Sequence, residues 1–447
     1  MKNKTKPSIS SSRFSRRDFV RTSAVLMAGA ALPQILPSGV LAAAGQPGAN
    51  DRIGVGIIGM GRQATGLLSG LLKLPQAKLV AVADVNLNRA KAVTTKHGGE
   101  PMQDFRRLLD RPDVDAIITA TPEHWRANII LAACQAGKDI YAEKPVSLTI
   151  REGRLMVQAA RKYRRVFQVG SQQRSQWVDI EACAFLRKGG IGKLTKIQYQ
   201  NYPTPWECAL PEQKIPDGLD WEMWCGPMPT VPYNEDLYLP RANPGWLSFR
   251  PYSGGEMTGW GAHGFDMIQD ALGMDESGPV EIWSEGPFAP PTYTGSEKKD
   301  RGDKLCSDRK VFFKYANGLV LEPGTEPKPP GFGAIFISDK VNFRLDRGRC
   351  ESDPEEVALD LMSKRPRNFN DDHMKNWLDC IKSRQTPNAD IEIGHRSATV
   401  CHLGNIARWT GRRLRWDPVK EEFTGDADAN KYLDRERRKP WTLPEKI

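Results

Sequence analysis

The strongest indication of the fold is one short stretch, Ile53-Gly54-Val55-Gly56-Ile57-Ile58-Gly59-Met60-Gly61-Arg62-Gln63-Ala64. Its first six residues are a continuous apolar run, which is typical of a buried parallel strand. The G-x-G-x-x-A pattern follows, and the residues after it predict a helix over 65–74. Gly59 permits a tight turn, Gly61 lets the backbone approach a pyrophosphate, and Ala64 allows the helix to pack closely on the strand. The stretch therefore predicts a dinucleotide-binding βαβ unit, and Arg62 and Gln63 in its turn are further candidates for cofactor contacts.

A second apolar strand, predicted over 77–83, ends at Asp84. A carboxylate at this place can accept hydrogen bonds from both adenosine ribose hydroxyls, and it would repel a 2′-phosphate. We therefore expect NAD as the cofactor. The nearby cations Arg62 and Arg89 leave NADP as an alternative.

The strand–helix pattern then repeats. A third buried strand is predicted over 116–121, a helix over 127–136, and a fourth strand over 139–142 that ends at Glu143-Lys144-Pro145. Such alternation predicts a parallel sheet whose ligands bind beyond the carboxyl ends of its strands. Lys144 stands at such an end, where a buried lysine can act as an acid or a base. The alternative is a surface lysine paired with Glu143.

Together these motifs make the chain resemble the Gfo/Idh/MocA family (glucose-fructose oxidoreductase, inositol dehydrogenase). The resemblance runs from about Ile53 to Trp441. It implies an α/β fold with an NAD(P)-binding Rossmann domain over 50–170 and a substrate domain over 171–447. The second domain is built on a large, open, mainly antiparallel sheet that often forms a subunit interface, so a homo-oligomer (dimer or tetramer) is expected. The residues that it places at the cofactor are Gly59, Gly61, Arg62, Gln63, Asp84, Thr121, Pro122, His124, Glu143 and Lys144.

The segment 254–266 resembles the glycine-rich approach to the family's D-x-G-x-H-x-x-D helix start. His263 takes the place of the histidine and Asp266 that of the following acid, whereas Gly259 replaces the first acid. The resemblance implies that Lys144 and His263 are catalytic and handle the proton of the substrate hydroxyl. A structural histidine that caps a helix is the alternative for His263.

Several side chains around this segment are candidates for secondary roles. Asp266, one helical turn after His263, could orient the imidazole, and Glu256 or Tyr252 could replace the missing acid. The expected substrate contacts are Gln173, Arg174, Trp260, His263 and Asp266, with a structural salt bridge as an equal alternative for Arg174. For most of the tryptophans at 206, 221, 224, 246 and 260 we expect core packing rather than sugar stacking.

The rest of the second domain is predicted more coarsely. Residues 286–309 read as a solvated loop, 371–383 and 394–409 as helices, and 417–443 as a polar tail that docks through Trp441. His395 and His402 share a helix face without convincing further ligands, and the eight cysteines are scattered. No metal site is therefore expected.

The chain has 447 residues and a formal net charge of +10, of which the first 44 residues carry +6. The order Arg16-Arg17, a short apolar run from Ala24 to Leu32 and Ala42-Ala43-Ala44 resembles a twin-arginine export signal over residues 1–44. We therefore expect a periplasmic or other extracytoplasmic protein. The apolar run is too short for stable membrane insertion. The remaining +4 gives no basic stripe, so nucleic acid is not an expected partner.

These observations predict an exported NAD(P)-dependent oxidoreductase that acts on a sugar, polyol or glycoside by hydride transfer. Two alternatives stay open. The first is a redox-assisted glycoside hydrolase with tightly bound NAD, since the twin-arginine route carries folded proteins that already hold a cofactor. The second is a non-catalytic sugar- or cofactor-binding protein, suggested by Gly259.

Overall fold

The structure is a computed structural model that describes residue 48 and residues 51–239, 245–325 and 327–447. The predicted export signal at residues 1–44 lies outside the described residues. Residues 53–447 form one compact unit. None of the helices in the described part of the chain is both long and apolar enough to cross a membrane.

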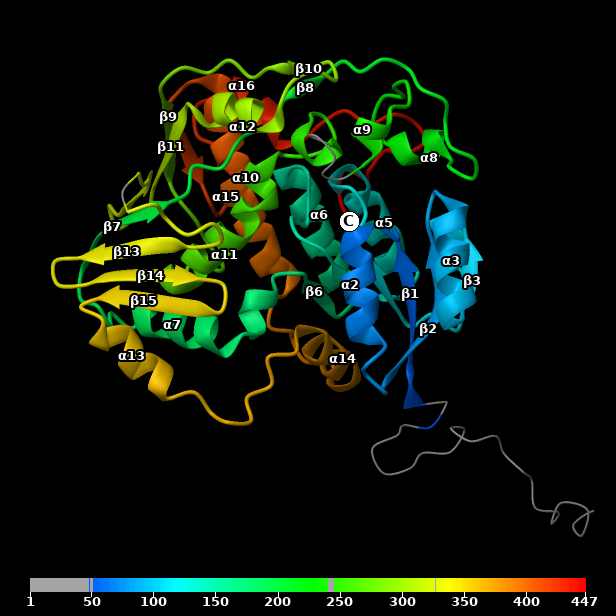
Figure 1. The fold of residues 1–447 in the computed structure, drawn as a ribbon, viewed down its shortest axis with the longest axis horizontal. Coiled ribbons are helices and arrows are strands. Elements are labelled where there is room, and N and C mark those ends of the chain that lie inside the picture. Colours follow the sequence, from blue (N-terminus) through cyan, green and yellow to red (C-terminus); the bar gives the residue numbers. More distant parts are fainter. Residues whose placement is uncertain (1–47, 49–50, 240–244, 326) are drawn as a thin grey trace, which may run out of the picture. The chain divides into compact units, whose positions relative to one another are not determined.

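The first half of this unit is a parallel six-stranded sheet in the order β3-β2-β1-β4-β5-β6 (Figure 1). Its strands are β1 (Ile53–Ile58), β2 (Ala77–Ala83), β3 (Glu100–Met102), β4 (Ala116–Thr119), β5 (Asp139–Ala142) and β6 (Phe167–Val169). Its helices are α2 (Arg62–Leu71), α3 (Leu87–His97), α4 (Phe105–Leu109), α5 (Glu123–Gln135) and α6 (Ile150–Lys162). The predicted parallel sheet is confirmed. Helix α5 begins four residues before its predicted start, so His124 lies in its first turn.

Apolar cores cover both faces of this sheet. One core joins β1 to α2 and to α14 (His373–Ser383), and the other joins β4 and β5 to α5 and α6. Helix α14 comes from the second half of the chain and places Trp377 against the first sheet. The sheet therefore has helices on both faces, as a buried parallel sheet requires.

The second sheet has nine strands in the order β15-β14-β13-β7-β12-β11-β9-β16-β17, and all pairs are antiparallel except β7 with β12. These strands are β7 (Leu194–Tyr199), β9 (Glu281–Glu285), β11 (Lys310–Lys314), β12 (Val320–Pro323), β13 (Ala334–Ser338), β14 (Asn342–Asp346), β15 (Arg349–Asp353), β16 (Leu414–Asp417) and β17 (Glu422–Phe423). Burial alternates along β11, where Val311 and Phe313 point into the core. The predicted open, mainly antiparallel sheet is confirmed.

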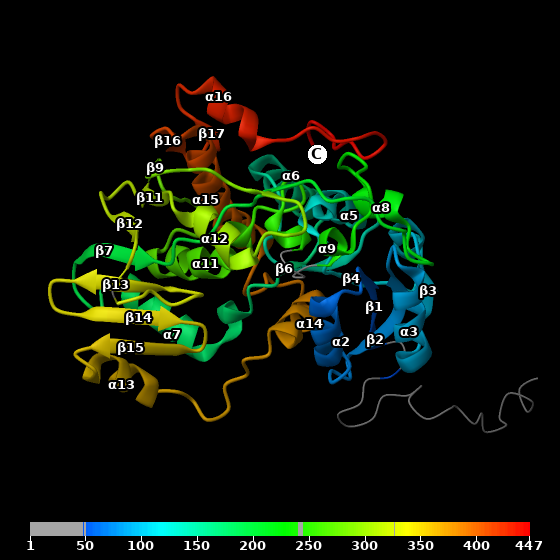
Figure 2. The same cartoon turned by 45° about the horizontal axis from the view of Figure 1, so that its top comes forward.

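Helices pack against this sheet, and shorter elements lie around it (Figures 1 and 2). The longer helices are α7 (Trp177–Arg187), α11 (Gly261–Leu272), α13 (Glu356–Ser363) and α15 (Ile391–Thr410). The shorter elements are α8 (Trp221–Cys225), α9 (Glu235–Tyr238), α10 (Glu256–Gly259), α16 (Ala427–Asn430), the paired strands β8 (Glu207–Cys208) and β10 (Thr292–Tyr293), and 3-10 helices at Gln172–Ser175, Trp246–Ser248 and Lys431–Leu433. Helix α11 packs against both α7 and α15, and α15 in turn packs against α6 and β6 of the first half.

The prediction of a solvated loop over residues 286–309 is wrong. The segment contains β10 and the helix α12 (Lys299–Ser307). Gly302 of α12 lies so close to the Trp206 indole that an added Cβ would be 1.9 Å from it, and Cys306 is buried. Packing against the indole stabilises a helix whose local sequence is mostly charged, so the tertiary contact overrides the sequence pattern.

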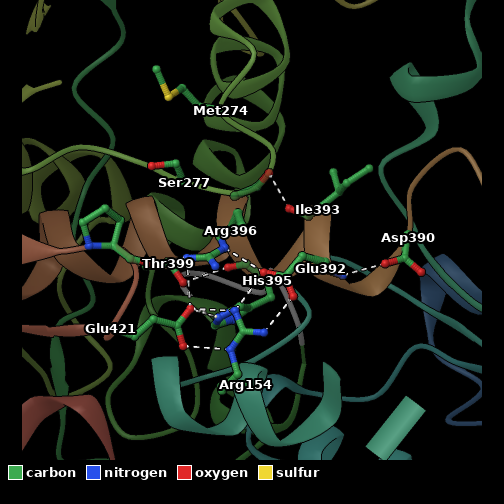
Figure 3. Close-up of polar contacts among 12 residues, drawn as sticks. Arg154, Met274, Ser277, Asp390, Glu392, Ile393, His395, Arg396, Thr399 and Glu421 are labelled. Carbon is green, nitrogen blue, oxygen red and sulfur yellow. Dashed lines mark hydrogen bonds and ion pairs between the residues drawn. The ribbon is translucent and has the colours of Figure 1, made fainter. Parts of the chain in front are cut away.

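An ion-pair network joins the two halves of the unit (Figure 3). Arg154 of α6 contacts Glu392 of α15 at 2.7 Å and Glu421, just before β17, at 2.8 Å. His395 donates from Nε2 to Glu421 at 2.6 Å. The network holds α15 and the end of the second sheet against the Rossmann half.

Candidate active site

The turn after β1 presents backbone rather than side chains. Gly59 has a φ of +84°, and an added Cβ would lie 2.7 Å from the Thr121 methyl group. An added Cβ on Gly61 would meet nothing within 4 Å, so the space above Gly61 is open. Helix α2 starts there with no side-chain cap and no acidic residue in its first turn. Its unpaired N–H groups and positive dipole end fit the pyrophosphate of a dinucleotide.

Asp84 stands at the end of β2, as the sequence predicts. Its carboxylate accepts hydrogen bonds from the backbone N–H groups of Met60 (2.6 Å) and Asn86 (2.7 Å), and burial raises its pKa. Each carboxylate oxygen can accept a second bond, so Asp84 can still bind ribose hydroxyls. Arg89 lies beside it in the same pocket.

A deep pocket runs over the carboxyl ends of the first sheet. It contains about 1290 Å³ of space that no protein atom fills, its open mouth included. The predicted cofactor residues Gly59, Gly61, Arg62, Gln63, Asp84, Thr121, Pro122, Glu143 and Lys144 all line it. His124 does not. It is fully buried under Trp224, where its Nε2 lies 2.8 Å from the Trp224 carbonyl and burial lowers its pKa to about 3. The structure thus gives His124 a packing role.

The second half of the chain supplies the opposite wall of this pocket. We call residues 216–239 and 245–247 the roof segment; its Met223, Trp224, Tyr238, Trp246 and Leu247 face the pocket. Sequence reasoning assigned no cofactor role to these residues. The cluster of aromatic residues over 221–246 was the feature of the sequence that could have indicated a role at the pocket.

The roof segment is tied to the end of the pocket at Asp84. The Asp220 N–H donates to the Val85 carbonyl at 2.9 Å, and the Leu87 N–H donates to the Gly218 carbonyl at 2.9 Å. The Asn88 amide adds a bond to the Asp217 carbonyl at 2.9 Å. Backbone bonds of this kind fix the roof segment in place over the pocket.

Lys144 lies in the pocket wall, not on the surface. Its ammonium donates to the Gly259 carbonyl at 3.0 Å, which links the first sheet to α10. The neighbouring Glu143 accepts from the side-chain amides of Gln63 (3.0 Å) and Gln172 (3.1 Å). Lys144 is thus half-buried in the pocket wall, and its role in catalysis stays a prediction.

The imidazole of His263 is buried and neutral, and it does not line the dinucleotide pocket that Lys144 lines. Its pKa lies well below the usual value because of burial and the positive charges of Lys144 and Arg347. Its Nδ1 lies 3.0 Å from Gln173 Oε1, an oxygen that can only accept, so Nδ1 carries the proton and Nε2 the lone pair. The Gln173 amide is itself oriented by a 2.7 Å bond from its Nε2 to Asp266. The network sets the tautomer that a proton acceptor needs.

Asp266 and Arg174 form a buried ion pair. Arg174 donates from Nε to Asp266 at 3.0 Å and from Nη2 to Asp275 at 2.7 Å, and its side chain is only 6% exposed. The structure therefore gives Arg174 the salt-bridge role that the sequence left as an alternative. Asp266 acts on His263 through Gln173 rather than by direct contact.

The space that Gly259 leaves is filled by a neighbouring carboxylate. An added Cβ on Gly259 would lie 2.6 Å from Glu256 Oε2. Glu256 also lies 3.6 Å from Lys299 of α12. Tyr252, the other candidate for this role, packs with its ring edge against His124 instead.

A second buried acid, which sequence reasoning did not identify, lies near Lys144. Glu123 accepts from Ser253 Oγ at 2.8 Å and from the Gly254 N–H at 3.1 Å. Burial raises its pKa to about 7, although Arg126 acts in the opposite direction. Glu123 thus ties the first turn of α5 to the glycine-rich segment.

Two family models cover almost all of residues 53–443. Residues 53–171 match an oxidoreductase family NAD-binding Rossmann fold, and residues 187–443 match an oxidoreductase family C-terminal alpha/beta domain. The chain belongs to the Gfo/Idh/MocA oxidoreductase family. The NAD-binding character of its first domain is thereby confirmed.

Curated relatives of this family match shorter parts of the chain. A glycosyl hydrolase family 109 protein of Saccharopolyspora erythraea is 34% identical over 176 residues, which is 35% of this chain and 38% of that protein. The scyllo-inositol 2-dehydrogenase (NAD(+)) of Bacillus subtilis is 31% identical over 139 residues, 31% of this chain and 41% of that protein. The chain thus spans less than half the length of these relatives.

Solved structures share the fold over a longer range. The WlbA dehydrogenase of Bordetella pertussis, in complex with NADH and UDP-GlcNAcA, has a TM-score of 0.57 and 16% identity. The match covers 82% of this chain and 99% of that one. At this identity the likeness shows the Gfo/Idh/MocA fold alone.

Proposed function

We propose that the protein is an exported NAD(P)-dependent oxidoreductase that transfers a hydride between nicotinamide and a carbon of a sugar, polyol or glycoside. The observation that carries this proposal is that Lys144, which lines a pocket that fits a dinucleotide, lies close enough to the buried imidazole of His263 to lower its pKa. The nicotinamide ring, when bound, supplies the hydride acceptor or donor. The protein positions the reacting carbon and manages the hydroxyl proton.

The two catalytic candidates divide the proton chemistry. In oxidation, the C–H hydrogen leaves as hydride and the hydroxyl proton goes to a base. His263 Nε2, with its lone pair, is suited to accept that proton. The Lys144 ammonium, held by the Gly259 carbonyl, can stabilise the oxygen from which the proton leaves, and in the reverse direction it can donate a proton to a carbonyl.

The roof segment lines the wall of the pocket opposite the first sheet, which favours a cofactor that stays bound between turnovers. A retained cofactor must be returned to its starting state within the site. Either a second sugar takes back the hydride, or the same glycoside is oxidised, cleaved and reduced again. The family 109 glycosyl hydrolase among the relatives makes glycoside cleavage the second candidate function.

The first experiment identifies the cofactor and the class of reaction. Protein purified with its native signal is denatured and the released dinucleotide is identified by mass, and absorbance near the reduced-nicotinamide band is followed across a panel of sugars, polyols and glycosides. We expect about one dinucleotide per chain and a substrate-dependent absorbance change. Protein that neither carries nor binds a dinucleotide refutes the oxidoreductase and the hydrolase alike, and ligand binding without any redox change favours the non-catalytic alternative.

Two variants test the site. Lys144→Met and His263→Ala should each lower turnover by roughly 100-fold or more, within the usual range for general acid–base groups, while the bound dinucleotide remains. Unchanged turnover in both variants would refute the assignment. Light scattering of the purified protein tests the proposed homo-oligomer.

A further inference from the structure

Outside the dinucleotide pocket, the predicted substrate residues Trp260 and His263 form an aromatic corner with Phe332. The guanidinium of Arg347 lies next to this corner. The Phe332 ring centroid lies 4.5 Å from that of Trp260 and 5.6 Å from that of His263. Trp260 is 37% exposed, in contrast to Trp206, Trp221 and Trp224, which are buried in the core. The Arg347 guanidinium lies 5.3 Å from the centroid of the same Phe332 ring. Phe332 is therefore the centre of a corner that His263 also shares.

Arg347 reaches this corner from the turn between β14 and β15. One of its N–H groups, on Nη2, points to Gln172 Oε1 at the long distance of 3.4 Å. The Gln172 amide nitrogen in turn donates to Glu143 and to the Tyr141 hydroxyl, each at 3.1 Å. Gln172 thus connects Arg347 to the wall of the cofactor pocket and holds the guanidinium in place.

Arg347 differs from the neighbouring arginine in its partners. Among the described residues, no carboxylate makes an ion pair with Arg347. Arg349, the first residue of β15 at the end of the same turn, pairs with Asp346 at 3.3 Å and is 64% exposed. Buried Arg174 likewise has Asp266 and Asp275. Arg347 is therefore a half-buried cation whose charge the fold leaves without an ion pair.

The positive charge of Arg347 acts together with that of Lys144. Both cations lower the pKa of His263, after burial. The imidazole itself is neutral, and the buried acids on which these cations act, Glu123 for Lys144 and Asp179 for Arg347, have pKa values raised to about 7 by burial. A negative group of a ligand near His263 would be attracted by both cations.

We infer that the substrate of the proposed reaction carries a carboxylate, and that Arg347 binds this carboxylate while Trp260 and Phe332 cover the C–H face of the sugar ring. The inference rests on the proposed function, because it names the substrate class of that site. A guanidinium fork matches the two oxygens of a carboxylate. The same fork also matches a phosphate, so glucose 6-phosphate is the ligand that separates the two in the test. The expected substrates are uronic or aldonic acids and their glycosides.

The test compares ligands that differ in one group. D-Glucuronate, D-galacturonate and D-gluconate are compared with D-glucose, D-galactose and glucose 6-phosphate on the dinucleotide-loaded protein, by thermal shift and by kcat/KM. We expect the carboxylates to raise Tm and to give the higher kcat/KM. Arg347→Gln should lower kcat/KM for a carboxylate by about 10- to 100-fold, the range for losing a hydrogen bond to a charged group. Arg347→Lys should restore part of it.

Arg349→Gln is the matched control, since it removes the same charge from the same turn. It should change kcat/KM by less than about twofold. Equal effects of the two variants, no preference for carboxylates, or a stronger response to glucose 6-phosphate would each overturn the inference. The thermal shift reads carboxylate binding without turnover. A protein that binds uronates through Arg347 but holds no dinucleotide would therefore refute the proposed function and leave the carboxylate site standing.

Discussion

Gln173 Oε1 lies 3.0 Å from His263 Nδ1 and thereby fixes which nitrogen of the imidazole carries the proton. Because an amide oxygen can only accept, the arrangement leaves the lone pair on Nε2. A neutral histidine in this tautomer is a base at neutral pH. This relationship makes Gln173 a positioning residue for the proposed chemistry.

Replacing Gln173 should therefore reduce turnover without emptying the cofactor pocket. Gln173→Met should lower kcat by roughly 10- to 100-fold, within the range of general acid–base effects, and should change the pH profile of kcat. Gln176→Met, in the same segment, is the control and should behave like the wild type. An unchanged pH profile with a uniformly lower Tm would mean that Gln173 is merely structural.

The open space above Gly61 predicts a separation of stability from cofactor binding. Gly61→Val should weaken dinucleotide binding by roughly 10- to 100-fold, because the side chain enters the space meant for the pyrophosphate, and should lower the free energy of unfolding by no more than about 1 kcal/mol, the cost of a poorer N-cap residue. Gly70→Ala, inside α2 and equally open, should stabilise the protein by about 0.5–1 kcal/mol and leave binding intact. Urea unfolding and dinucleotide titration measure the two effects. Tight binding by Gly61→Val would contradict the placement of the pyrophosphate.

The hydrogen bond between the Asn88 amide and the roof segment should control the rate at which the cofactor dissociates. Gly218 has a φ of +84°, and an added Cβ would lie 2.6 Å from Asn88 Nδ2. Gly218→Ala should displace that amide and speed dinucleotide dissociation by roughly three- to tenfold, the effect of one lost hydrogen bond. Gly189→Ala has a similar backbone cost (φ +77°) but no neighbour within 4 Å, so it is the control. Equal dissociation rates in the two variants would show that the roof segment does not retain the cofactor.

Burial of His373 predicts a loss of stability in mild acid. Burial lowers its pKa to about 4, whereas an unfolded histidine titrates near 6.5. As pH falls from about 6.5 to about 4, the unfolded state takes up the proton first, so the free energy of unfolding falls by up to about 1.4 kcal/mol per pH unit. In His373→Gln this contribution is absent. Urea unfolding at several pH values should therefore show a shallower acid slope for the variant than for the wild type, and parallel slopes would contradict the shift.

The proposed export depends on Arg16 and Arg17, because a receptor recognises the arginine pair itself rather than positive charge in general. Arg16→Lys together with Arg17→Lys keeps the charge but should leave the protein inside the cytoplasm as a full-length precursor. Arg13→Lys is the control and should be exported normally. Fractionation and mass analysis of the N-terminus provide the readout. Normal export of the double variant would refute the twin-arginine route.

The Rossmann half and its phosphate turn could be predicted from the amino-acid order alone. A continuous apolar run, the glycines at 59 and 61, and Asp84 are local signals whose meaning depends on near neighbours. Lys144 was also predictable, because it directly follows a strand of the same sheet. By contrast, the sequence pattern of residues 299–307 failed to predict α12, because its stability comes from packing under Trp206.

Contacts between residues far apart in the chain depend on how the folded elements pack. The tertiary structure buried His124 under Trp224, gave Arg174 to Asp266, and set Gln173 between Asp266 and His263. It also brought Arg347 and the roof segment to the site. Such contacts join different sheets and helices, and no sequence spacing encodes them. The physical reason is that burial and ion pairing depend on which surfaces meet, and that is settled only when the two halves pack together.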